Sequence, residues 1–198
     1  MEKSIYTLAK TAFNSDTIFL KCCIIKLSDY FIKRIGFMWK NSRELTINEV
    51  ARIPFFNDSS DEDLKILSEM LELYYYDEDK YIFKEGEIQD SLFFIMNGSV
   101  KVLKKTEEGN NETLAQFDAP QVIGEMALIS PGTRSASIMS TTAVTAIRFG
   151  CSSFEKIIKK RPELAINILR KAGNTVSTRL RKANQTYLKA IHEPENHS

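Results

Sequence analysis

The spacing of apolar side chains predicts helices at the start of the chain. Over residues 5–40 they recur every three or four positions, which is the period of an amphipathic helix. Residues 45–52 have the same period and end before Pro54, and capping residues at 58–61 precede another helix around Leu64. We therefore expect a helical N-terminal extension followed by two short helices.

After these helices, apolar side chains recur at every second position, which is the period of a β-strand. After Tyr74, short runs rich in β-branched and aromatic residues alternate with turns such as Asn97-Gly98. Glycine suits these turns because it adopts positive φ without a Cβ clash. Strands at this spacing indicate an antiparallel sandwich or barrel. The runs predict strands at residues 74–76, 81–84, 91–96, 99–105, 113–117, 135–140 and 144–149.

A helical period returns near the C-terminus. A short helix is predicted over residues 152–160, and Pro162 fits the first turn of a longer helix that runs to about Ile191. A stripe of small and apolar residues follows this helix in steps of three and four. It fits either a dimer seam of coiled-coil type or a face against the barrel. Its members are Ala165, Leu169, Ala172, Val176, Leu180, Ala183 and Tyr187.

Length and composition indicate one globular domain with an appendage. The chain has 198 residues, of which 43% are hydrophobic and 27% charged, as in an ordinary globular protein. The apolar-looking stretch at residues 17–39 contains several charges, so it does not read as a transmembrane segment. Residues 1–13 lack the order of a secretory signal, and a cytoplasmic location is expected.

Charge is unevenly distributed although the net charge is only +1. Residues 54–130 sum to about −11 and residues 131–198 to about +8. A basic C-terminal region is compatible with nucleic acid or an acidic partner. A solvated helix face is the commoner explanation.

Several kinds of chemistry lack their residues. The three cysteines form neither a disulfide framework nor a CxxC pair, and both histidines lie near the C-terminus. No nucleotide-phosphate loop or dinucleotide fingerprint occurs, and the acidic clusters at 61–63 and 77–79 lack the spacing of a calcium loop. We expect no catalytic residues, no metal and no cofactor.

Residues 124–136 bring together a glycine, a carboxylate and a cation. Gly124 lets the backbone come close, Glu125 offers an acceptor, and residues 127–129 can begin a helical turn whose amides face an anion. Arg134 adds a permanent charge and a fork of donors. These groups suit the phosphodiester and ribose of a cyclic nucleotide. Taken alone, a glutamate and an arginine at this spacing are more commonly a buried ion pair.

The wider pattern makes this segment specific. Residues 123–137 read Ile-Gly-Glu-Met-Ala-Leu-Ile-x4-Arg-Ser-Ala-Ser, which resembles the phosphate-binding cassette of the cyclic nucleotide-binding domain family. The resemblance extends upstream to residues 83–100, which read Phe-x2-Gly-Glu-x2-Asp-x2-Phe-Phe-Ile-x2-Gly-Ser-Val. It covers roughly residues 46–190.

The resemblance implies an α+β fold: an antiparallel β-jelly-roll barrel of about eight strands, with flanking N-terminal helices and a long C-terminal helix. It implies that cyclic AMP or cyclic GMP lies between barrel and cassette, with Glu125 on the ribose and Arg134 on the phosphate. The other residues implied are Gly124, Met126, Ala127, Ser135 and Ala136 around the phosphate, and Val102 and Ile123 as apolar walls for the base.

Some details stay open within the resemblance. Many family members carry glycine where this chain has Pro120, so the turn there is expected to be built differently. Ser135 does not decide between adenine and guanine, because members with a hydroxyl at this position differ in preference. The last helix is expected to cover the base through Arg179, Leu180 or Arg181, either apolarly or by a cation–π contact.

Four parts are predicted: an extension at 1–45, the barrel domain at 46–161, a helix at 162–191 that serves as lid, dimer seam or both, and a flexible tail at 192–198. Many bacterial relatives continue into a helix-turn-helix domain. Seven residues follow Ile191 here, so DNA binding is not expected.

The favoured hypothesis is a stand-alone sensor that is not an enzyme and signals to an unidentified protein partner. The extension at 1–45 is the candidate transmitter, and the last helix is the candidate homodimer seam. An interaction module that keeps the fold without ligand, and a nucleic-acid binder using the basic end, are the alternatives.

Overall fold

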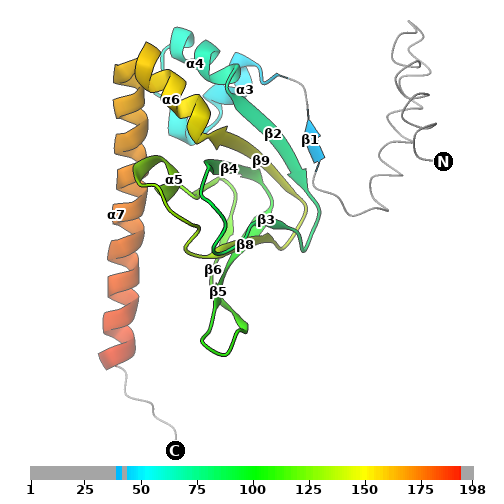
Figure 1. The fold of residues 1–198 in the computed structure, drawn as a ribbon, viewed down its shortest axis with the longest axis vertical. Helices are drawn as coiled ribbons and strands as arrows, with labels where there is room; N and C mark the ends of the chain where they lie inside the picture. The colour runs from blue at the N-terminus through cyan, green and yellow to red at the C-terminus, as the bar shows by residue number, and fades with distance from the viewer. Residues whose placement is uncertain (1–38, 42–43, 193–198) are drawn as a thin grey trace, which may run out of the picture. The chain divides into compact units, whose positions relative to one another are not determined.

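Two antiparallel sheets form a barrel with helices at one end and along one side (Figure 1). The computed structural model describes residues 39–41 and 44–192. In spatial order the five-stranded sheet contains β1 (Trp39–Asn41), β2 (Leu71–Tyr76), β9 (Val144–Gly150), β4 (Ser91–Asn97) and β7 (Gln121–Ile123). The four-stranded sheet contains β3 (Tyr81–Phe83), β8 (Ser137–Ser140), β5 (Ser99–Lys105) and β6 (Asn111–Asp118). The predicted jelly-roll barrel is confirmed.

Short helices precede the barrel, and side-chain caps set where they begin. Helix α3 (Ile47–Ala51) starts after Thr46, and α4 (Asp61–Ser68) starts after Ser60. In both, the cap hydroxyl accepts a hydrogen bond from an amide of the first turn, which would otherwise lack an intrahelical partner. The 3₁₀ turn η1 (Pro54–Phe56) separates them. Both short helices lie where the sequence predicts them.

Two strands depart from the predictions. The prediction of a helix up to residue 40 is wrong at its end: residues 39–41 form β1, which pairs antiparallel with Leu73–Tyr75 of β2. Strand β7 is not predicted from the sequence; it pairs with Phe93–Ile95 of β4. In both cases hydrogen bonds to a distant strand decide the local structure. Residues 1–38 and 42–43 of the predicted extension lie outside the described residues.

The core is divided between the barrel interior and the barrel-to-helix interface. Ile95, Val100 and Ala146 are fully buried between the two sheets. Phe94 and Phe149 lie on the other face of their strands and pack against the helices. This alternation follows from the period of two along a strand. The helix-packed cluster anchors the elements that carry the site.

Helix α6 (Cys151–Lys160) leads from the barrel into α7 (Pro162–His192), which runs beside α5 (Met126–Ile129) and along the barrel (Figure 1). The first half of α7 is buried at Ala165, Ile168 and Ala172. The second half is open: Leu180 is 60% and Tyr187 68% exposed. The stripe along this helix is therefore buried in the helix-packed cluster at its start, while its last members are exposed in the part of the chain that the structure describes. No helix in the described ranges is both long and apolar enough to span a membrane.

Candidate functional site

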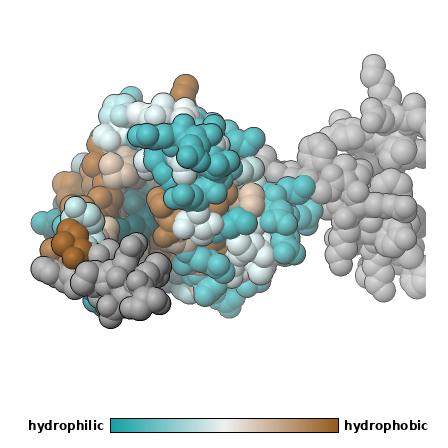
Figure 2. All heavy atoms as spheres, turned by 90° about the horizontal axis from the view of Figure 1, so that it is seen from below, coloured by the Kyte–Doolittle hydropathy of each residue, from teal (hydrophilic) through white to brown (hydrophobic). Residues whose placement is uncertain are grey.

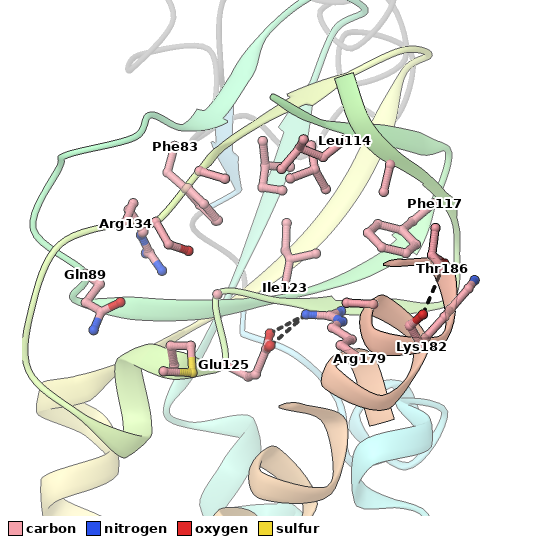
Figure 3. A pocket seen from close by; sticks show the side chains of 18 of the residues that line it. Phe83, Gln89, Leu114, Phe117, Ile123, Glu125, Arg134, Arg179, Lys182 and Thr186 are labelled. Carbon is pink, nitrogen blue, oxygen red and sulfur yellow. Dashed lines mark hydrogen bonds and ion pairs between the residues drawn. The ribbon is translucent and has the colours of Figure 1, made fainter. Parts of the chain in front are cut away.

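A cavity of about 610 Å³ opens between the barrel, the segment 124–136 and the second half of α7. Arg134 lies at one end of the cavity, and Glu125 and Arg179 lie across from it, with apolar side chains between them (Figure 3). Seen from below, the opening is a hollow with hydrophobic residues on both sides (Figure 2). Its volume lies within the range of small-molecule sites in proteins, roughly 300–1,000 Å³.

Gly124 lies directly against Arg134, where a side chain would not fit. Its φ is +72°, in the left-handed region that favours glycine. A Cβ atom at this position would lie 2.5 Å from Nη1 of Arg134 and 3.4 Å from the ring of Phe83. The backbone of residue 124 thus forms a wall directly against the arginine.

Backbone hydrogen bonds hold Arg134 in place. Its amide donates to the carbonyl of Glu87 at 2.8 Å, and its carbonyl accepts from the amide of Gly86 at 2.9 Å. The side-chain amide of Gln89 donates to the carbonyl of Ser130 at 2.6 Å. The second half of the segment 124–136 is therefore held against the loop between β3 and β4 by hydrogen bonds.

Arg134 is a buried cation with spare donors. It is 5% exposed. Nη2 donates to the hydroxyl of Ser91 at 3.3 Å and lies 3.9 Å from Asp90. Neither Nε nor Nη1 has a hydrogen-bond partner in the described part of the chain. Burial lowers the pKa of this arginine, against the opposing effect of Asp90. Buried donors of this kind indicate a site for an anion.

Glu125 is equally buried, at 5% exposed, but its carboxylate is occupied. Nη1 of Arg179 on α7 donates to both carboxylate oxygens, at 2.7 Å each. Nη2 of Arg179 donates to the carbonyl of Val122. The guanidinium also lies 5.5 Å from the centroid of the Phe117 ring. This network ties α7 to the segment 124–136 (Figure 3).

The apolar part of the cavity suits a flat aromatic group. Val102, Ile123 and Ile138 line it from the barrel. Ala183 and Tyr187 line it from α7. Apolar walls on two sides can cover the faces of a ring system and leave its edge toward solvent.

The structure brings together nearly all of the predicted site residues. Ala127 is the exception: it does not line the cavity, and its carbonyl instead accepts from Sγ of Cys151 at 3.3 Å. Among the candidates for covering the base, Arg179 lines the cavity, whereas Leu180 is largely exposed and Arg181 bonds to Ser177. The predicted residues that do line it are Val102, Ile123, Gly124, Glu125, Met126, Arg134, Ser135, Ala136 and Arg179.

Several lining residues were not predicted as part of the site. Phe83 belongs to the motif at residues 83–100, which gave it no role at the ligand. Tyr187 belongs to the stripe on the last helix, where it was assigned only to a seam or a packing face. Ala183 belongs to the same stripe, and the others carry no signal, because the local pattern of a strand, loop or helix does not tell which side chains meet a ligand. The unpredicted residues are Phe83, Gln89, Leu114, Ala115, Phe117, Ile138, Lys182, Ala183, Thr186 and Tyr187.

Comparison with known proteins identifies the central segment. Residues 74–161 match the family model of the cyclic nucleotide-binding domain. The chain is 27% identical over 135 residues to a CRP-like cAMP-activated global transcriptional regulator of Mycobacterium tuberculosis, covering 68% of this chain and 58% of that protein. It is 32% identical over 127 residues to cGMP-dependent protein kinase, isozyme 1, of Drosophila melanogaster, covering 61% of this chain and 16% of the kinase. The chain thus spans less than two thirds of either relative.

Solved structures show the same fold. A cyclic nucleotide-binding domain from Methylobacillus flagellatus superposes with a TM-score of 0.64 at 23% identity, covering 82% of this chain and 85% of the other. The N-terminal domain of a transcriptional regulator from Streptomyces coelicolor superposes with a TM-score of 0.55 at 29% identity, covering 70% of this chain and 94% of the other.

Proposed function

We propose that this chain, whose residues 74–161 belong to the cyclic nucleotide-binding domain family, binds cyclic AMP or cyclic GMP as a regulatory sensor and is not an enzyme. One observation carries the proposal. The buried Arg134 presents Nε and Nη1, unpartnered among the described residues, in a cavity that also contains the buried carboxylate of Glu125. A cyclic phosphate and its adjacent ribose carry the matching groups.

The phosphate end is selective for a compact anion. The two unpartnered nitrogens of Arg134, Nε and Nη1, can each donate a charge-assisted hydrogen bond to an anion such as a phosphodiester. Gly124 lets the ligand approach the backbone where any side chain would meet the arginine. Ser135 and Ala136 continue the wall with small side chains. This geometry supports the roles that the resemblance implies for these residues.

At the ribose end, the carboxylate of Glu125 already has a hydrogen-bond partner on α7. Glu125 already accepts from Arg179, yet an ionised carboxylate has about four acceptor positions, so a ribose 2′-hydroxyl can donate to those that Arg179 leaves open. Binding would then strengthen or replace the link between Glu125 and α7. The base would lie against the apolar walls, which fit adenine and guanine alike.

The signal would leave through α7 or through the N-terminal extension. Arg179 connects the ligand site to α7, whose exposed second half is the candidate seam for a homodimer. Strand β1 joins the extension to β2, which supports residues 1–45 as the route to a protein partner. A ligand that binds one position of α7 better than another would shift the population between them. The cytoplasmic location expected from the sequence is part of this proposal.

The direct test is calorimetric titration of the chain with cyclic AMP and with cyclic GMP. We expect micromolar or tighter binding of at least one, and about 100-fold weaker binding after Arg134→Ala, which removes two charge-assisted hydrogen bonds. Arg161→Ala is the matched control, because Arg161 pairs with Glu62 and Asp63 away from the cavity. The proposal would be refuted if neither nucleotide gave a heat of binding, or if the Arg134 variant bound with unchanged affinity.

The hydrogen bonds from Arg179 to Glu125 favour a second candidate function. A carboxylate that is already satisfied by α7 fits an interaction module that keeps the fold without a ligand. The same titration separates the two functions, because such a module would bind neither nucleotide.

A further inference from the structure

We propose that Phe83 is the positioning residue of the phosphate site: its ring holds the guanidinium of Arg134 by stacking and leaves the Nε and Nη1 donors without a partner within the described ranges. The inference rests on the proposed function for the identity of the ligand. The guanidinium carbon lies 4.0 Å from the centroid of the Phe83 ring, and the two side chains lie side by side at one end of the cavity (Figure 3). Arginine stacks on aromatic faces because its planar cation meets the negative face of the ring.

Contacts in the plane of the guanidinium are too weak to fix it. The bond from Nη2 to Ser91 is long, at 3.3 Å, and Asp90 lies 3.9 Å away. The Asp90 side chain is 63% exposed and bonds Arg148 at 2.8 Å, so its charge is shared and screened. The stacking contact at 4.0 Å therefore compensates a charge whose ion pair, at 3.9 Å, is with an exposed carboxylate shared with Arg148.

Phe83 and Gly124 together form a narrow slot. The missing Cβ of Gly124 would sit 2.5 Å from Nη1 of Arg134 and 3.4 Å from Cε1 of Phe83. A flat guanidinium fits such a slot, whereas the ammonium of a lysine has no face to stack. The slot thus selects the shape of the cation as well as its charge.

The ring of Phe83 is itself held in place. It packs on Phe93 with a centroid distance of 6.0 Å, and Phe93 in turn packs on Tyr74 at 6.5 Å. Phe83 also ends β3, opposite Ile138 of β8. A ring fixed by both sheets transfers that rigidity to Arg134, whose Nε and Nη1 have no hydrogen-bond partner among the described residues to hold them.

Binding measurements on Phe83 variants test this role. We expect about tenfold weaker binding of cyclic nucleotide in Phe83→Leu and nearly unchanged binding in Phe83→Tyr, which keeps the aromatic face. Phe154→Leu is the control, because it removes a buried ring that contacts Phe149 rather than Arg134. Affinity in Phe83→Leu equal to that of the parent would overturn the proposal.

A double-mutant cycle shows whether Phe83 acts through Arg134. On an Arg134→Lys background, where stacking is already lost, Phe83→Leu should weaken binding by less than about twofold. A full tenfold loss on both backgrounds would mean that the ring contacts the ligand directly, which contradicts a positioning role.

A third measurement needs neither ligand nor variant. The Nε–H and δ protons of Arg134 should be shifted upfield by the ring current in the NMR spectrum of the unmodified chain. Resonances at ordinary arginine positions would overturn the stacking contact itself. If the chain binds neither cyclic AMP nor cyclic GMP, the proposed function fails, and this shift still decides whether Phe83 positions Arg134.

Discussion

Two arginines face the same cavity from opposite walls, and they are bonded in opposite ways. Arg134 extends from the barrel side, is almost fully buried, and keeps two nitrogens without a partner in the described structure. Arg179 extends from α7, is one third exposed, and has both terminal nitrogens bonded. The contrast shows that one wall is prepared for a ligand, while the other is satisfied without one.

The backbone around each arginine agrees with this division. Arg134 is fastened through main-chain bonds to the β3–β4 loop. Around Arg179, by contrast, α7 is tied to the segment 124–136 by side-chain bonds to Glu125 and Val122. Side-chain bonds can be exchanged without rebuilding a sheet. We therefore infer that ligand binding adds contacts at the barrel wall and redistributes contacts at the α7 wall.

The largest effect that would break this comparison is expected from Gly124→Ala. The new Cβ would clash with Nη1 of Arg134 and strain a φ of +72°. We expect the free energy of unfolding to fall by about 1–3 kcal/mol and affinity to fall about 100-fold, measured by urea titration and calorimetry. Gly109→Ala is the matched control: its φ is +85° with open space at the Cβ position, so it should show the strain and keep the binding.

A smaller effect is expected from Arg179→Ala, which tests the other wall. The ligand-free chain should lose about 1 kcal/mol of stability, a value kept low because Arg179 is partly exposed. Affinity should fall by less than about tenfold, because a ribose hydroxyl can then take the vacated positions on Glu125. Arg181→Ala is the control. A loss of binding as large as that of Arg134→Ala would contradict the proposed difference between the walls.

The smallest effect concerns pH and Asp90, which lies behind Arg134. Burial acts to raise the pKa of Asp90, but a hydrogen bond from Ser91 and the charges of Arg148 and Arg134 outweigh it and lower the pKa. A lowered pKa adds stability above the unfolded value of about 3.9, and this stability is lost as pH falls through the folded pKa. In urea titrations from pH 6 to pH 3, the free energy of unfolding should therefore fall less steeply with pH in Asp90→Asn than in the parent. Identical slopes would exclude the contribution of Asp90.

Much of the fold follows from local pattern. The strands at 99–105 and 144–149, the capped helix around Leu64 and the long helix after Pro162 all carry a clear period or a start signal. Strands β1 and β7 carry no such signal in the sequence. They exist because β2 and β4 offer sheet edges.

The site was predictable where chemistry and spacing coincide. Gly124, Glu125 and Arg134 stand in one short segment, so their meeting in the cavity could be foreseen. The bond between Arg179 and Glu125 joins residues more than fifty positions apart, and no local pattern encodes how α7 turns toward the segment 124–136. Phe83 escaped notice for a different reason: an aromatic residue in a strand is usually core, and its ring face becomes functional only through the arginine placed on it.

The most direct test of the account follows the Nε–H resonances of both arginines while cyclic AMP, and separately cyclic GMP, is added. We predict that the Arg134 resonance shifts strongly and its proton exchanges more slowly with water, because it gains a bond to phosphate. The Arg179 resonance should shift less, because one partner set is exchanged for another. A saturable change at Arg179 with none at Arg134 would contradict the claim that the unpartnered arginine receives the ligand.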